Sequence, residues 1–365
     1  MYIYELPHWP HFSWDLPHIA ELLIRVRHEQ GCLTGGMESI GFQLRDKTIV
    51  QTLTQDALKS SEIEGEIFEP EQVRSSVARQ LGMEQATAPP DKHIDGVVSM
   101  ILDATQNFDA PLTKERLFRW HTNLFPEGRS GWKKITIGDW RKGAVYVVSG
   151  QMDREKIHFE APPASHVEAE MEHFLHWVNE ENDVDLVLKS AIAHLWFVTI
   201  HPFDDGNGRI GRAIADFLLA RSEKSSHRFY SLSKQIQAER KDYYAILEHT
   251  QKGSLTITSW IEWFLVCLER AIQTAYGALQ KVVYKSHMWE KIAKVSLNDR
   301  QRKALNRLLD GFEGKLTSSK WAKMTKCSQD TAHRDIVDLI EKGILVKNSE
   351  GGRSSSYSLR DPLTS

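Results

Sequence analysis

Cysteine is scarce in this chain of 365 residues. Only Cys32, Cys267 and Cys327 occur, and no two of them form a CxxC pair. Disulfide frameworks and thiolate zinc sites need paired or clustered cysteines, so their scarcity argues against both. It fits a reducing compartment, and we expect the protein to be cytoplasmic.

Long apolar runs and an excess of one charge are also lacking. No stretch approaches the ~20 apolar residues that span a bilayer, and the amino terminus, MYIYELPHWP, has no basic segment followed by an apolar run. We therefore expect no membrane partner. With 46 basic and 49 acidic residues, the net charge of -3 gives no global basic field for nucleic acid. The composition is that of an ordinary globular protein, with 41% hydrophobic and 26% charged residues.

Apolar residues recur at helical spacing along most of the chain, which predicts a mainly α protein. The break at Ala88-Pro89-Pro90 suggests a helical extension over 1–90, followed by a core with trailing helices over 91–285, a charged linker over 286–296 and a last unit over 297–365. The helices expected in the core are Ile94–Phe108, Glu115–Leu124, Val167–Asn179, Leu186–Ile200 and Arg209–Arg221, with further helical pattern over Lys241–Val283.

One segment of the core has a different pattern. Ala144–Val148 is rich in β-branched residues, Ser149-Gly150 suits a turn, and Ile157–Phe159 can return as a second strand. The sequence therefore predicts a small hairpin that contains Val145, Tyr146, Val147 and Val148.

The last unit combines three expected helices with a strand pair. The helices are Leu297–Asp310, Ser318–Met324 and Ser328–Lys342, and the strands are Ile344–Val346 and Ser355–Leu359, joined through Gly351-Gly352. This order resembles a winged helix-turn-helix. From residue 297 onward there are 13 basic and 9 acidic residues, against 33 and 40 before it. DNA or partner contact through Thr331, His333, Arg334 and Arg353 is therefore one hypothesis, and a docking or dimerisation module, including a homodimer, is the other.

The most informative segment is HPFDDGNGRIGR, residues 201–212. It interrupts two apolar helices, so it predicts a helix-loop-helix whose glycines let backbone amides face a bound anion at the start of the second helix. Gly206, Asn207 and Gly208 would supply donors to phosphates, and Arg209 and Arg212 would add forked donors.

The same segment offers groups for chemistry. Asp205 is the natural ligand for Mg²⁺, with Mn²⁺ as an alternative, because such ions take one or two carboxylates together with phosphate oxygens. His201 has a side chain that titrates near neutrality and can accept the proton of an attacking hydroxyl. Each residue alone is more often structural, but eight specified positions in one segment are not explained by chance.

This segment resembles the Fic family motif HxFx(D/E)GNGRxxR, which it matches at His201, Phe203, Asp205, Gly206, Asn207, Gly208, Arg209 and Arg212 without a departure. The resemblance implies a Fic-type helical bundle that moves AMP from ATP to a Ser, Thr or Tyr hydroxyl of a protein, with self-modification left open. It also implies His201 as base, Asp205 on Mg²⁺ and Arg212 on the terminal phosphates. The similarity covers roughly residues 1–285.

Two further features follow from the resemblance. The Val145–Phe159 hairpin would be the flap that holds the target segment by strand-like pairing. Ser60, Glu64 and Gly65 resemble the (S/T)xxxE(G/N) inhibition motif, so Glu64 would pair with Arg212 in two hydrogen bonds and block productive binding of ATP. The alternative interpretation of this short motif is a surface helix with acidic residues near Gly65.

Other functions remain open at the level of sequence. The chain could be a DNA-binding regulator whose Fic unit senses a nucleotide, or a Fic enzyme that uses another donor or removes AMP. The target protein, the base specificity and the signal that relieves inhibition are not encoded in any pattern we recognise.

Overall fold

The computed structural model describes residues 1–83, 87–149, 156–181, 183–293, 295–309, 311–312, 314–348 and 355–360. The chain folds into two units, Met1–Tyr276 and Gly277–Ser365, and the boundary falls inside one helix, α11. Within the described residues most elements are helices, as predicted, and the strands form three separate two-stranded sheets. No described helix is both long and apolar enough to cross a membrane.

The described residues of the first unit form eleven α-helices, the last of which continues into the second unit. They are α1 (Leu16–Glu38), α2 (Phe42–Ile63), α3 (Pro70–Gln80), α4 (Lys92–Gln106), α5 (Lys114–Leu124), α6 (Val167–Asn179), α7 (Leu186–Ile200), α8 (Asn207–Glu223), α9 (Leu232–Ala238), α10 (Arg240–Gln251) and α11 (Thr258–Ala293). Two 3₁₀ turns, η1 (Ile3–Glu5) and η2 (Ala164–His166), complete the helical part.

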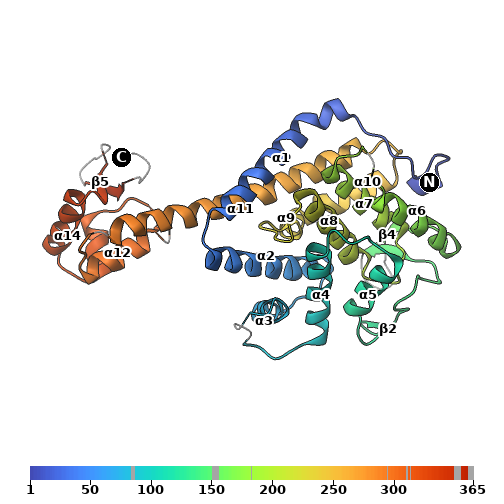
Figure 1. Cartoon of the computed structure of the whole chain (residues 1–365), viewed down its shortest axis with the longest axis horizontal. Coiled ribbons are helices and arrows are strands. Elements are labelled where there is room, and N and C mark those ends of the chain that lie inside the picture. The colour runs from blue at the N-terminus through green and yellow to red at the C-terminus, as the bar shows by residue number, and fades with distance from the viewer. Residues whose placement is uncertain are drawn as a thin grey trace. The chain divides into compact units, whose positions relative to one another are not determined.

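The α7–α8 pair lies at the centre of this unit (Figure 1). Asp185 caps α7 by accepting a hydrogen bond from the Val187 amide at 2.8 Å, and every residue of α7 after Leu186 is buried. A helix that is apolar all round has to be surrounded by others, which places α7 in the core. The turn between α7 and α8 is thereby held on a rigid support.

The amino-terminal helices pack on this core. Arg25 of α1 pairs with Glu269 of α11 at 2.9 Å, which aligns α1 with the first part of that helix. α2 contacts α9, α3, α4 and α8, and its final residues lie next to the α7–α8 turn. Ile63 is the last residue of α2, Glu64 is its C-cap, and Gly65 has φ 88°.

Two hairpins follow α5. Strands β1 (Arg129–Ser130) and β2 (Lys133–Lys134) pair antiparallel, as do β3 (Tyr146–Ser149) and β4 (Lys156–Glu160), which have a bulge at Val147/Val148. The predicted hairpin is therefore present, although Val145 precedes the first strand and Gly150 lies outside the described residues. The β1–β2 hairpin was not expected from the sequence.

The second unit has the predicted order of elements. Helices α12 (Asp299–Leu309), α13 (Ser318–Thr325) and α14 (Gln329–Glu341) precede an antiparallel pair, β5 (Leu345–Lys347) and β6 (Tyr357–Leu359), in which Leu345 opposes Leu359. Trp321, Ile336 and Leu339 are fully buried in its core. Thr317 and Ser328 cap α13 and α14. Arg353 and the Gly351-Gly352 turn lie outside the described residues.

The segment expected as a linker is helical over most of its length. Residues 286–293 continue α11, and Met288 and Ile292 are buried in the core of the second unit. Their spacing of four residues keeps both on one helix face. The charged residues between them hid this period in the sequence.

Candidate active site

His201 is the C-cap of α7 and has left-handed backbone angles, φ 53° and ψ 58°. Its half-buried imidazole places Nδ1 3.0 Å from the Val198 carbonyl oxygen. A carbonyl can only accept, so Nδ1 carries the proton and Nε2 keeps a free lone pair. Burial lowers the pKa of His201, and Arg141 lowers it further, so the ring is neutral at pH 7. The predicted base is thus in the form that can accept a proton.

The strained turn at His201 is held by Arg141, a residue that the sequence did not point to. Its buried guanidinium donates to the carbonyl oxygens of His201 at 2.7 Å and Gly143 at 2.8 Å, and to that of Pro162 at the exit of the β3–β4 hairpin. Arg141 therefore ties the hairpin to the turn. No pattern in the sequence distinguishes a buried arginine in a short loop from an exposed one.

His121 of α5 supports the next part of the loop. It is fully buried, stacks on Phe203 with ring centroids 4.1 Å apart, and lies with Nε2 3.2 Å from the Asp205 carbonyl oxygen. Burial lowers the pKa of His121 to about 4, so it stays neutral and Nε2–H donates. Phe203 is fully buried and packs in the core.

The side chain of Asn207 forms hydrogen bonds within the loop. Its amide side chain accepts from the Phe203 amide at 3.0 Å and donates to the Phe203 carbonyl at 2.8 Å. These bonds use the side-chain oxygen and one N–H of the side-chain amide. The second N–H has no partner inside the loop, so the contact of Asn207 with phosphate stays a prediction.

The start of α8 forms a cradle for negative charge. Gly206 has φ 81°, and the first helical hydrogen bond runs from the Ile210 amide to the Gly206 carbonyl, so the amides of residues 207–209 precede the helical ladder. A Cβ built on Gly208 would lie 2.1 Å from Oε1 of Glu64. Only glycine admits a carboxylate this close, at the positive end of the helix dipole.

Arg212 forms hydrogen bonds with the residues at the end of α2. It is 1% exposed and donates from one terminal nitrogen to Glu64 Oε1 at 2.8 Å, from Nε to the Ser60 hydroxyl at 3.0 Å and from the other terminal nitrogen to the Ser60 carbonyl at 2.7 Å. The predicted contact of Glu64 with this arginine is present as one hydrogen bond and not as the expected two. Ser60, whose contact was not predicted, accepts two further bonds.

Arg209 forms an ion pair with a second carboxylate, which was not predicted from the sequence. Its terminal nitrogen lies 2.6 Å from Glu66 Oε2, and the guanidinium, buried to 2% exposure, lies over the Phe125 ring at 5.0 Å. Glu66 follows Gly65 directly, so the turn that ends α2 delivers two carboxylates to two arginines. The acidic run around Gly65 was the available signal.

Asp205 is the one predicted metal ligand. Its Oδ1 accepts from the Gly206 amide at 2.6 Å, and its Oδ2 accepts from the Ser130 hydroxyl of β1. Among the described residues no three His, Cys, Asp or Glu side chains converge. A single oriented carboxylate beside an anion cradle fits Mg²⁺, which completes its shell with phosphate oxygens and water.

The β3–β4 hairpin exposes part of its predicted docking strand. Tyr146 and Val148 are 45% and 43% exposed, and Val147 is half-buried. Phe159 is buried against Tyr2 of the amino-terminal segment, with ring centroids 5.0 Å apart, and the His158 ring contacts Glu248 of α10 at 2.6 Å. The hairpin is thus held to the rest of the unit through β4, and β3 is exposed to solvent. Val145 instead accepts from the Ala161 amide at 3.1 Å.

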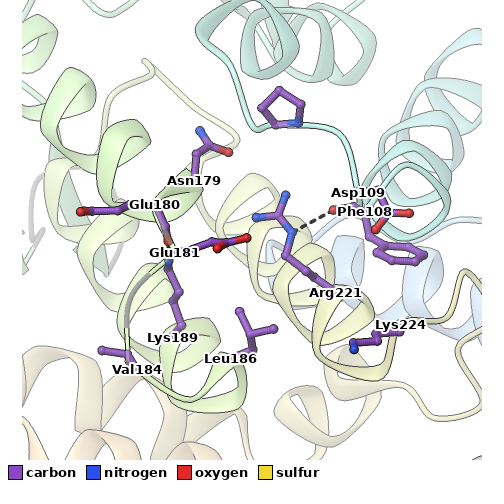
Figure 2. Close-up of a pocket in the computed structure, with 11 residues that line it drawn as sticks. Phe108, Asp109, Asn179, Glu180, Glu181, Val184, Leu186, Lys189, Arg221 and Lys224 are labelled. Atoms are coloured by element: carbon purple, nitrogen blue, oxygen red, sulfur yellow. Dashed lines mark hydrogen bonds between the residues drawn. The ribbon is translucent and has the colours of Figure 1, made fainter.

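A cavity of about 750 Å³ lies elsewhere, at the far ends of α7 and α8 (Figure 2). Lys189 and Arg221 line it but donate to the backbone carbonyls of Glu180 and Phe108. Lys189 precedes His201 by twelve helical residues, roughly 18 Å along the axis. This cavity therefore does not belong to the α7–α8 turn.

The residues proposed for DNA contact lie on α14. His333 and Arg334 are exposed, whereas Thr331 is half-buried, with its hydroxyl 2.9 Å from the Ser328 hydroxyl at the helix cap. Arg353 lies outside the described residues.

Comparison with known proteins finds related sequences for two parts of the chain. The Fic/DOC family model matches residues 111–219, and a domain of unknown function, DUF4172, matches residues 2–83. A probable protein adenylyltransferase of Aquifex aeolicus is 36% identical over 140 residues, 36% of this chain and 42% of that protein. Protein adenylyltransferase Fic of Drosophila mojavensis is 31% identical over 140 residues, 38% of this chain and 24% of that protein. The chain thus spans less than half the length of these curated relatives.

Solved structures share the fold. A Fic family protein from Desulfovibrio desulfuricans covers 96% of this chain and 98% of its own, with a TM-score of 0.58 and 22% identity. The Fic-1 protein of Caenorhabditis elegans covers 72% of this chain and 74% of its own, with a TM-score of 0.54 and 19% identity. From the matched model, the relatives and the fold, this chain carries a Fic/DOC family domain at residues 111–219.

Proposed function

We propose that this chain is an autoinhibited protein adenylyltransferase that moves AMP from ATP to a Ser, Thr or Tyr hydroxyl of a cytoplasmic protein and releases pyrophosphate. The observation that carries the proposal is the α7–α8 turn: an imidazole with a free Nε2 lies beside a helix start that already holds a carboxylate against Gly208 and Arg212. Relatives named protein adenylyltransferase support the reaction.

The chain's own residues account for the steps. Nε2 of His201 takes the proton of the attacking hydroxyl, whose oxygen bonds to the α-phosphorus as the bond to the β-phosphate oxygen breaks. The free amides at the start of α8 and the two arginines stabilise the charge of the departing pyrophosphate. Arg141 and His121 keep the turn in place. Asp205 would hold Mg²⁺, which would neutralise charge on phosphate oxygens.

Autoinhibition follows from the same contacts. Glu64 lies where a phosphate oxygen would meet Gly208 and Arg212, and Glu66 occupies Arg209. A carboxylate and a phosphate repel each other and cannot share these donors. ATP therefore binds productively only when the end of α2 moves or its charges are removed.

The test is transfer of label from α-³²P-ATP with Mg²⁺ to protein, using Glu64→Gly chain with and without a cell lysate. We expect labelled protein from Glu64→Gly and none from the double variant Glu64→Gly/His201→Ala. Labelled protein in both, or in neither while ATP binds normally, contradicts the proposal. The second outcome favours a nucleotide sensor.

A second candidate role concerns residues 297–365. The three helices and the strand pair resemble a winged helix, and α14 exposes His333 and Arg334. We propose DNA contact through this face. Electrophoretic mobility shift at 50 and 200 mM salt tests it: a shift lost in His333→Ala/Arg334→Ala supports DNA contact, and no shift at either salt concentration contradicts it.

A further inference from the structure

The β1–β2 hairpin presents a tryptophan to solvent. Strand register pairs Arg129 with Lys134 and Ser130 with Lys133, which leaves Gly131 and Trp132 as a two-residue turn. Gly131 has φ 53°, as tight hairpin turns of this kind require. The side chain of Trp132 is 99% exposed, so it adds nothing to the packing of the fold. The ring is therefore free to contact a partner, and tryptophan is enriched among the residues that carry binding energy at protein interfaces.

Three cations lie on the two strands that flank this turn. Arg129, Lys133 and Lys134 are exposed, and none of them forms an ion pair with the described residues. Glu127 is the single acidic residue between Pro126 and Lys134. The hairpin is thus a local positive patch on a chain whose net charge is -3.

The hairpin is fastened to the catalytic loop. The Ser130 hydroxyl donates to Oδ2 of Asp205, and the Thr136 amide donates to Oδ2 of Asp204 at 2.9 Å. Because the chain spans at most about 3.6 Å per residue, the Cα atom of Trp132 lies within roughly 7 Å of that of Ser130. The aromatic tip therefore lies at the rim of the proposed reaction site.

We propose that this hairpin, Arg129–Lys134, is a docking element for an acidic segment of the protein that receives AMP. The inference rests on the proposed function. Tryptophan and arginine supply much of the energy of protein interfaces, and a tip anchored at both ends loses little entropy on binding. Unpaired cations attract carboxylates, while the residues before 297, which carry the hairpin, have 33 basic and 40 acidic side chains and as a whole repel a nucleic acid backbone. An acidic protein segment is the partner that matches both charges.

Two synthetic peptides test the docking element. Each carries one Tyr, flanked by Glu and Asp in the first and by Lys in the second, and each bears a fluorescein label. We expect the acidic peptide to bind the Glu64→Gly chain in fluorescence anisotropy at least tenfold more tightly than the Lys peptide. Trp132→Ala should weaken this binding about tenfold, and Lys133→Glu/Lys134→Glu should reverse the preference. Lys47→Glu, a charge change at an exposed position of α2, is the matched control.

Kinetics and nucleotide binding complete the test. With the acidic peptide as acceptor, Trp132→Ala should raise KM about tenfold and leave kcat and the Kd of ATP within twofold. Equal binding of both peptides, unchanged binding in Trp132→Ala, or a weaker Kd of ATP in that variant would overturn the proposal, the last by placing Trp132 in the nucleotide site. Tighter binding of single-stranded DNA than of the acidic peptide would overturn it as well.

The two proposals fail in different ways. Specific binding of the acidic peptide without transfer of AMP to any protein supports the docking element and contradicts the adenylyltransferase. Transfer without preference for the acidic peptide does the reverse.

Discussion

Two arginine–carboxylate pairs in this chain have similar nitrogen–oxygen distances but differ in which partner is buried. Arg212 and Glu64 lie 2.8 Å apart, and Arg300 and Asp335 lie 2.9 Å apart. In the first pair the cation is buried, with 1% of its side chain exposed against 30% for Glu64. In the second the anion is buried, with 6% exposed against 42% for Arg300.

The difference concerns what remains when the carboxylate is removed. Without Glu64, a buried cation is left at a helix start that attracts anions, and a nucleotide phosphate can take the vacated place. Without the charge of Asp335, the hydrogen bonds from Asn298 and Arg300 weaken, and no ligand replaces them. In the proposed function the first pair acts as a lock on the ATP site, whereas the second pair is a structural contact.

The largest expected effect comes from opening the lock completely. Glu64→Gly should raise AMP transfer about tenfold to a hundredfold, because one charge-assisted hydrogen bond of about 1.5–3 kcal/mol no longer competes with phosphate. Adding Glu66→Gln should raise it further, to several hundredfold, by freeing Arg209. Initial rates of label transfer measure this. Glu62→Gln, whose partners are Lys59 and Gln237, is the matched control and should change nothing. A double variant no faster than Glu64→Gly rules out a role for Glu66.

Gly208→Ala should separate the inhibitory contact of Glu64 from the binding of phosphate at the start of α8. The added methyl group would lie 2.1 Å from Glu64 Oε1, so it displaces that carboxylate but also fills the place of the phosphate. We expect ATP to bind about tenfold more weakly and transfer to stay low. Calorimetry of ATP binding measures the loss. Gly35→Ala in α1, where nothing lies within 4 Å, serves as the control. Activation by Gly208→Ala would mean that phosphate does not use this position.

Asp335→Asn tests the structural pair. Burial opposes ionisation of Asp335, but hydrogen bonds from Arg300 and Asn298 outweigh it and lower the pKa of its carboxyl. The variant should lose about 1–3 kcal/mol of unfolding free energy for the second unit, measured by urea denaturation, with AMP transfer unchanged. A lowered pKa stabilises the fold above the ordinary pKa and ceases to do so as pH falls through the folded value. The gap between variant and parent should therefore close below about pH 4.

The smallest effect concerns His201. Because burial lowers its pKa, the neutral base persists to lower pH than for a free histidine, whose pKa is about 6.5. We expect the acidic limb of kcat/KM for Glu64→Gly to have its midpoint below 6.5. A profile with its midpoint at or above that value would assign the limb to another group.

Much of the helical fold was readable from apolar periodicity. The predicted helices Val167–Asn179 and Leu186–Ile200 have the observed bounds, since uninterrupted burial leaves a clear pattern. The hairpin was predicted from β-branched residues. The continuation of α11 to Ala293 was missed because charged residues interrupt the buried positions Met288 and Ile292.

The site divides in the same way. The residue types and spacing of 201–212 predict an anion-binding turn with a base. This prediction needs only local sequence, because glycines, prolines and helix ends act through local backbone geometry. Tertiary structure alone decided that Arg141 holds the turn, that Glu66 reaches Arg209 and that Ser130 meets Asp205. These contacts join segments up to 143 residues apart, and such pairings depend on how the helices pack rather than on any local pattern.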